Sequence, residues 1–149
     1  MTATNQVKGL PTTTRVLCVV YAVTAIAALI ATWSQNLAYV DSGNFLLSFA
    51  EDLKVTAAAR SITVDLLLLG IPLAILMVTE ARKHGVRFVW LYLLGSALTA
   101  ISVTFPLFLI ARELRIAKTD PTQVRLGDAL GLAIVAVAMA AMVVWVDVL

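Results

Sequence analysis

The residues of this sequence best able to do chemistry are one carboxylate and two amides beside long apolar runs. Asp65 stands at the head of the run 66–71, and Gln35 and Asn36 follow the apolar run that starts near residue 16. An acid next to hydrocarbon can act as a general acid, and neighbouring amides can orient it by hydrogen bonding. The three side chains can meet if the first run ends on the side of a membrane where the second begins.

Asp65 also has an interpretation that requires no site. If Ser61 is the N-cap of a helix, Asp65 falls in its first turns, where the positive end of the helix dipole stabilises an anion. Intramembrane acids are nevertheless frequent in proton transfer and ligand binding. The sequence therefore leaves a helix-end acid and a functional acid as alternatives.

The elements that position these residues are predicted to be membrane-spanning helices. Of the 149 residues, 61% are hydrophobic and 13% are charged, unlike an ordinary soluble domain. A helix crosses a bilayer with about 20 mostly apolar residues. We predict an all-α integral membrane protein with four transmembrane helices near residues 15–38, 62–80, 87–111 and 127–147.

The remaining segments are short. Residues 1–13 are predicted to be a flexible tail, and 14–149 a single four-helix transmembrane domain. Between the first two spans, apolar residues recur at helical spacing after Asn44, an N-cap residue type. Residues 44–54 therefore predict a short amphipathic helix that lies in the membrane interface or covers the span ends as a lid. Gly85, in the short loop "EARKHGVR", can end the second helix in the left-handed conformation.

Several classes of function are disfavoured by the composition. The net charge is +2, and the basic residues cluster beside span ends, so nucleic-acid binding is not expected. Cys18 and His84 are the only residues of their types, and neither has partners at metal-ligand spacing. No cofactor or metal site is predicted.

Small, hydroxylated and proline residues within the spans suggest helix packing and kinks. Small residues let membrane helices approach closely, and hydroxyl groups alone provide neither a strong acid nor a base. Proline leaves the carbonyl four residues earlier without its helical partner. The residues assigned to packing are Gly95, Thr99, Ser102, Gly127 and Gly131, and the predicted kinks are at Pro72 and Pro106.

Orientation is nearly undetermined under a four-span topology. The two sides then carry five and six Lys and Arg residues, so the positive-inside rule gives no decision. The dense basic loop between the second and third spans, and the basic residues before the first span, favour both termini in the cytoplasm. The membrane expected is a bacterial cytoplasmic membrane.

Residues 44–113 resemble a known family. The matching features are the Phe-rich segment before the second span, residues 58–65, "EARKHGVR" followed by "WLY", and "FPLFLIARE" at 105–113. The chain resembles the small bacterial membrane proteins grouped as domain of unknown function twenty-eight thirty-four. Many members look like three-span proteins, so the resemblance implies that the span from Leu126 onward is an extension. The family carries no assigned activity.

The predicted function is that of a non-catalytic packing or accessory subunit of a membrane assembly. Its expected partners are the lipid bilayer and a second copy or another membrane protein. One alternative is a membrane-embedded enzyme acting on an isoprenoid or other lipid, with Asp65 as general acid oriented by Asn36 and Gln35. A looser likeness to isoprenoid cyclases and isomerases supports that alternative only by analogy. A small transporter component is a further alternative.

Overall fold

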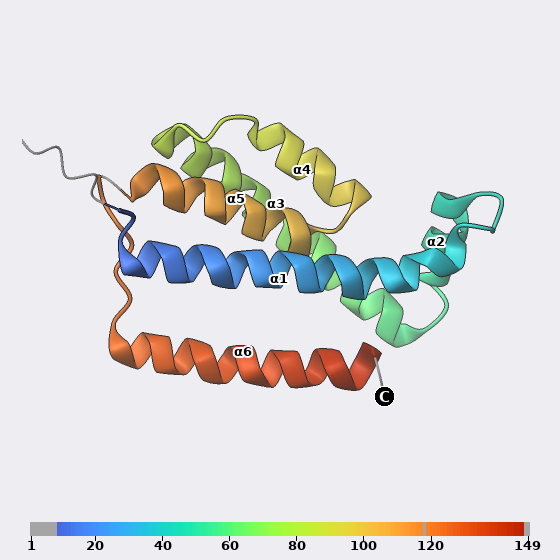
Figure 1. Cartoon of the computed structure of the whole chain (residues 1–149). Helices are drawn as coiled ribbons and strands as arrows, with labels where there is room; N and C mark the ends of the chain where they lie inside the picture. The colour runs from blue at the N-terminus through green and yellow to red at the C-terminus, as the bar shows by residue number, and fades with distance from the viewer. Residues whose placement is uncertain (1–8, 118, 148–149) are drawn as a thin grey trace, which may run out of the picture.

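The computed structural model describes residues 9–117 and 119–147, and all regular elements in these ranges are helices. Figure 1 shows their arrangement. The elements are α1 (Thr12–Asn36), the short 3-10 helix η1 (Leu37–Tyr39), α2 (Phe45–Asp52), α3 (Ala57–His84), α4 (Val89–Leu98), α5 (Ile101–Ile116) and α6 (Leu126–Asp147). The prediction of an all-helical protein is confirmed. Most of the predicted tail, residues 1–8, lies outside the described residues.

Three of these helices are long and apolar enough to cross a membrane. They are α1 together with η1, α3 and α6. The second helix starts earlier than predicted, because the Thr56 hydroxyl oxygen accepts a hydrogen bond from the Ala59 amide at 3.0 Å and caps α3 there. Asp65 is therefore the ninth residue of α3 instead of lying in its first turns. The helix-dipole interpretation does not hold, because that effect fades within one turn.

The segment predicted as a continuous helix over 87–111 is two helices in the structure. The chain breaks at Thr99 and Ala100, and α4 and α5 form an antiparallel hairpin. Residues 99–104 read "TAISVT", where β-branched side chains lower helix propensity; the break itself falls at Thr99 and Ala100, and residues 101–104 already form the first turn of α5. At the tip of the hairpin a Cβ added to Gly95 would lie 3.4 Å from Thr104 Cγ2, so the two helices approach closely.

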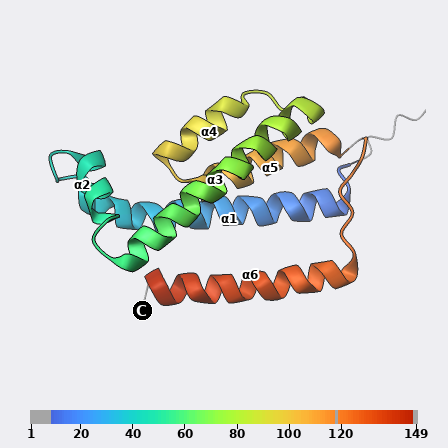
Figure 2. The same cartoon turned by 180° about the vertical axis from the view of Figure 1, so that it is seen from behind.

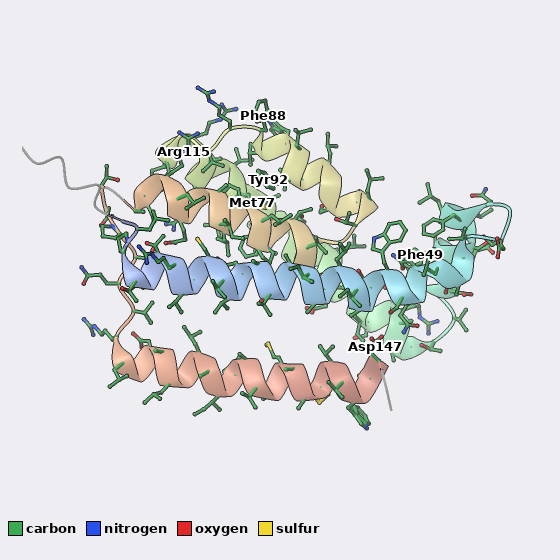
Figure 3. All side chains as sticks on the ribbon, in the orientation of Figure 1. Phe49, Met77, Phe88, Tyr92, Arg115 and Asp147 are labelled. Carbon is green, nitrogen blue, oxygen red and sulfur yellow. The ribbon has the colours of Figure 1, made fainter. Side chains whose placement is uncertain are left out.

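The packed core lies between α3, α4 and α5, and α5 also packs along α1. Phe108 and Met77 have no exposed surface. The Tyr92 ring meets Phe108 edge to face, with ring centroids 5.9 Å apart. Figure 3 shows Met77 and Tyr92 directed into this region. Val86 and Val89 complete the core near the α3–α4 turn.

The directions of the helices give the bundle two distinct ends. α1 and α6 run the same way, since the Gln35 side-chain amide near the end of α1 donates to Asp147 Oδ1 at the end of α6, at 2.8 Å. α3 and α5 run the opposite way, and Arg112 pairs with Glu80 near their C-terminal ends. The described chain therefore begins at one end of the bundle and finishes at the other.

Charge is distributed unequally between these ends. We call the end with the start of α1 and the C-termini of α3 and α5 the basic end, and the opposite one the acidic end. Among the described residues, the basic end carries Arg15, Arg82, Lys83, Arg87, Arg112, Arg115 and Arg125, with Glu80, Glu113, Asp120 and Asp128. The acidic end carries Lys54 and Arg60, with Asp41, Glu51, Asp52, Asp65 and Asp147. The formal sums are +3 and −3.

The turn between α3 and α4 depends on Gly85, as predicted. Its φ is 67° and ψ 29°, and the amide of Val86 bonds to the Ala81 carbonyl at 3.0 Å. A Cβ is disfavoured in this left-handed conformation. Gly85→Ala is therefore expected to lower the free energy of unfolding by about 1–2 kcal/mol in detergent-based unfolding assays.

Gly70→Ala is the matched control for Gly85→Ala. Gly70 lies inside α3, and a Cβ added there meets no atom within 4 Å. This substitution is expected to stabilise the protein by up to about 1 kcal/mol. Equal effects of the two substitutions would contradict a special role of the Gly85 conformation.

Candidate functional site

A cavity of about 720 Å³ lies beyond the tip of the α4–α5 hairpin, towards the acidic end. Its walls come from the ends of α1 and α6, from α2, from Leu66 of α3 and from the hairpin turn at residues 96–100. Segments far apart in the sequence therefore meet around one space.

The cavity follows from the length of α4. Ten residues of helix rise about 15 Å, roughly half of a hydrocarbon core of about 30 Å. The chain then turns back as α5, and the tip of the hairpin stops short of the end of α1 and of α2. The cavity occupies the space beyond the hairpin tip, between the ends of the longer helices.

The helix break itself lines the cavity. Thr99 and Ala100 separate the last carbonyls of α4 from the first amides of α5, and no side chain caps the start of α5. Helix ends leave up to four backbone groups unpaired. At membrane depth such groups are tolerated where protein covers them or where they line a cavity, and discontinuous helices form binding sites in many membrane proteins. The break therefore marks this region as the candidate site.

Polar atoms gather at one side of an otherwise apolar cavity. Gln35, Asn36 and Asp147 contribute two amides and a carboxylate, with Gln35 Nε2 donating to Asp147 Oδ1. In Figure 3 Asp147 lies beside the end of α1. The hydroxyl groups of Thr32 and Thr99 also line the space, but each donates to a carbonyl of its own helix, at 2.8 and 3.0 Å. These hydroxyls can therefore only accept a further hydrogen bond.

Helix α2 covers the cavity at the acidic end through Phe45, Leu46 and Phe49. Asn44 caps α2 by accepting from the Leu47 amide at 3.3 Å, as its residue type predicted. The Tyr39 ring packs edge-on against Phe49 with centroids 5.5 Å apart. Its hydroxyl group donates to Asp52 Oδ2 at 2.8 Å. These contacts hold α2 beside the end of α1, where it lines the cavity; its roles as a lid and as an interfacial helix remain predictions.

Two of the three residues predicted to do chemistry line this cavity. Gln35 and Asn36 are among its lining residues, whereas Asp65 is on the exposed surface of α3 and is not. Leu66, the next residue of α3, does line the cavity. The carboxylate that meets Gln35 is Asp147, which sequence reasoning did not select because it lies at the far end of the chain. Catalysis by Asp65 remains a prediction.

The residues predicted for helix packing lie in different environments. Gly95 and Thr99 belong to the hairpin tip, and Ser102 is exposed on α5. Gly127 and Gly131 are exposed on α6, and a Cβ on either meets no described atom within 4 Å. Their role in packing remains a prediction.

The two prolines predicted to kink the spans lie inside continuous helices. Pro72 is exposed in α3, and Pro106 is buried in α5. The break that interrupts the third predicted span lies six residues before Pro106, and kinks at the prolines remain predictions.

A second polar cluster, at the basic end, was not identified from the sequence. Glu113 is only 2% exposed, and its Oε1 accepts from Arg112 Nη1 at 3.1 Å and from the Thr122 hydroxyl group at 2.9 Å. Arg112 also bonds to Glu80, whose carboxylate lies 3.3 Å from His84 Nε2. One guanidinium group thus joins two carboxylates and ties α5 to α3. The cluster lies near the C-terminal ends of α3 and α5, away from the cavity.

Comparison with protein families identifies the chain. The model of the family described as protein of unknown function DUF2834 matches residues 20–114. The chain belongs to this family. Comparison with curated proteins and with solved structures gave no match.

The DUF2834 segment contains most of the candidate site. It includes the end of α1, helix α2, α3 and the hairpin up to Leu114. It stops before α6, whose last turn supplies Asp147 to the cavity. The apolar walls and the two amides thus lie within the DUF2834 match, whereas the carboxylate lies outside it.

Proposed function

We propose that this DUF2834 protein is a non-catalytic membrane protein that holds the apolar chain of a lipid in the cavity beyond the hairpin. The observation that carries the proposal is the helix break at Thr99 and Ala100, which lines a largely apolar cavity of about 720 Å³. Ligand sites are typically apolar cavities of this size with a few polar groups at fixed positions.

The polar groups limit the head group that fits. The carboxylate of Asp147 and the hydroxyl oxygens of Thr32 and Thr99 accept hydrogen bonds, and Asn36 can donate as well as accept. The acidic end has a formal sum of −3 over the described residues. A lipid with hydroxyl or ammonium donors, such as an isoprenoid alcohol or an amine-bearing lipid, matches these acceptors better than a phosphate would.

We also propose that the hairpin does not cross the bacterial cytoplasmic membrane, which leads to an orientation. If it enters and leaves at the basic end, the chain crosses three times, and seven of the described Lys and Arg residues lie on one side with two on the other. The positive-inside rule then places the basic end in the cytoplasm. This three-span topology differs from the orientation predicted from the sequence, in which both termini are cytoplasmic. It puts the end of α6 and the cavity on the outer side.

Labelling of single cysteines tests this orientation. In a Cys18→Ala background, Lys83→Cys and Gln123→Cys are expected to react with a membrane-impermeant maleimide only after cell lysis. Ser42→Cys is expected to react on intact cells. A four-crossing topology places residues 83 and 123 on opposite sides, so opposite labelling of these two cysteines would contradict the hairpin.

Filling the cavity tests lipid binding. Ala97 is exposed into the cavity, and Ala97→Trp is expected to reduce binding of a photoreactive isoprenoid alcohol by about tenfold or more, because the new ring occupies its space. Ala133→Trp, on the exposed surface of α6 outside the cavity, is the matched control. Equal photolabelling of the Ala97→Trp and Ala133→Trp variants would show that the cavity is not the lipid-binding site.

The substitution Asp65→Asn distinguishes lipid binding from the enzyme alternative. Since Asp65 does not line the cavity, Asp65→Asn is expected to leave lipid binding and cellular lipid composition unchanged. A lipid species that changes in the same way in the Asp65→Asn and deletion strains would favour catalysis.

A second candidate role concerns α6. Among its described residues none is buried, and it lies outside the DUF2834 match. We propose that α6 can pack against another membrane helix through its small residues, as an accessory subunit would. Gly131→Leu is then expected to disrupt a complex recovered in mild detergent, whereas a monomeric extract would contradict this role.

A further inference from the structure

A second concave region of about 690 Å³ lies at the basic end, between the α3–α4 turn and the C-terminal part of α5. Three guanidinium groups line it: Arg82 from the last turn of α3, Arg87 from the turn and Arg115 from α5. All three residues are exposed, and in the described part of the chain none of them pairs with a carboxylate. The region thus collects positive charge that no described protein group neutralises.

The same region also presents backbone donors. α4 begins at Val89 without a side-chain cap, and Phe88, Val89 and Trp90 line the space. The first amides of a helix lack helical partners and carry partial positive charge. Three arginines and these amides supply donors, and no carboxylate lies among the lining residues. An anion with several acceptor oxygens complements this arrangement.

Two exposed aromatic side chains lie beside the arginines. Phe88 is 71% exposed and Trp90 59% exposed. Figure 3 shows Phe88 at the start of α4 and Arg115 near the end of α5, both on the side of the molecule that faces away from α6. Aromatic rings favour the boundary between hydrocarbon and head groups, so exposed rings beside arginines suit contact with a lipid.

We propose that this pocket binds the phosphate group of an anionic phospholipid in the leaflet at the basic end. The guanidinium groups of Arg82, Arg87 and Arg115 hold the phosphate oxygens, and the rings of Phe88 and Trp90 lie against the glycerol and the upper acyl chains. Basic pockets between membrane helices are known to bind anionic lipid head groups. The site is independent of the cavity at the acidic end. That cavity favours a lipid with hydrogen-bond donors.

Native mass spectrometry of the full chain in mild detergent tests the proposal with phosphatidylglycerol and phosphatidylcholine as probes. Phosphatidylglycerol is expected to bind about 100-fold more tightly, because it carries a net negative charge and each arginine near an anionic lipid contributes about 1 kcal/mol, whereas the choline ammonium group offsets the phosphate charge of phosphatidylcholine. The variant Arg82→Gln/Arg87→Gln/Arg115→Gln is expected to lose this preference.

The control variant removes the same charge elsewhere. Arg15→Gln/Arg60→Gln/Arg125→Gln changes three residues that do not line the pocket and should keep the preference for phosphatidylglycerol. Equal loss in both variants would mean that total charge, and not this pocket, selects the lipid. Retention of the preference in the pocket variant would overturn the proposal.

Two further measurements separate the remaining explanations. Inorganic phosphate at millimolar concentration should not displace phosphatidylglycerol, since it lacks the chains that lie against the rings; displacement would assign the site to free phosphate. If the arginines only complement helix C-termini, the pocket variant would unfold at a lower temperature by the same amount in either lipid. A stabilisation by phosphatidylglycerol that disappears in the variant supports the proposal.

Discussion

Arg112→Met is expected to lower the free energy of unfolding by about 3 kcal/mol, because it leaves the buried carboxylate of Glu113 and the partly exposed carboxylate of Glu80 without their counter-charge. Glu113 is 2% exposed, and its described partners are Arg112 and Thr122. Glu80 loses the same guanidinium group. Unfolding measured by detergent titration, on protein purified at one pH and in one lipid mixture, gives the difference directly.

A triple variant provides the control for the Arg112 prediction. Removing both carboxylates together with the arginine, as Glu80→Gln/Arg112→Met/Glu113→Gln, is expected to recover most of the lost stability, because neutral amides cost less to bury unpaired. Arg125→Met, in the connection before α6, is expected to change stability by less than about 0.5 kcal/mol. A loss from Arg125→Met as large as that from Arg112→Met would show that the effect is not specific to the buried cluster.

Phe108→Ala is expected to cost about 2–3 kcal/mol. In a bilayer the surroundings are as apolar as the core, so little transfer energy is lost when a core residue is truncated. The cost comes from the space that remains: roughly 100 Å³ of side-chain volume at about 24 cal/mol per Å³. Phe108 has no exposed surface, and Tyr92 packs on it edge to face.

The substitution Leu107→Ala is the control for Phe108→Ala. Leu107 is 42% exposed, and Leu107→Ala removes contacts that lipid can replace. Its expected cost is below about 1 kcal/mol. If the two substitutions destabilised equally, the packing between α3, α4 and α5 would not be the main source of stability.

Local signals in the sequence predicted much of the helical structure. The apolar runs located α1, α3 and α6, and residue types located the cap at Asn44 and the end of α3 at Gly85. These features depend on residues that are close together in the sequence, so the local sequence is enough to predict them. The start of α3 was misplaced by about one turn, because Thr56 and Ser61 are both N-cap types, with Ser the more favoured, and only the structure shows that Thr56 is the cap.

The hairpin could not be predicted from apolar length. Residues 87–111 satisfy the length of a span, and hydropathy does not register a reversal inside an apolar segment. The β-branched run at 99–104 was a usable signal, but it is weak because such residues also occur within membrane helices. Asp147 was missed for a different reason: its contact with Gln35 joins residues 112 positions apart, and no local pattern reports such a pairing.

The bundle is closely packed between α3, α4 and α5 and contains a cavity beyond the hairpin tip, and this difference has a mechanical consequence. Close-packed protein interiors have low compressibility, and voids are the parts that yield. The half with the α3–α4–α5 core should therefore keep its cross-section when the surrounding lipid is squeezed or stretched, while the half beyond the hairpin tip should shrink or widen. A change in lateral tension would then move α6, none of whose described residues is buried, relative to the packed helices and alter the volume open to an occupant.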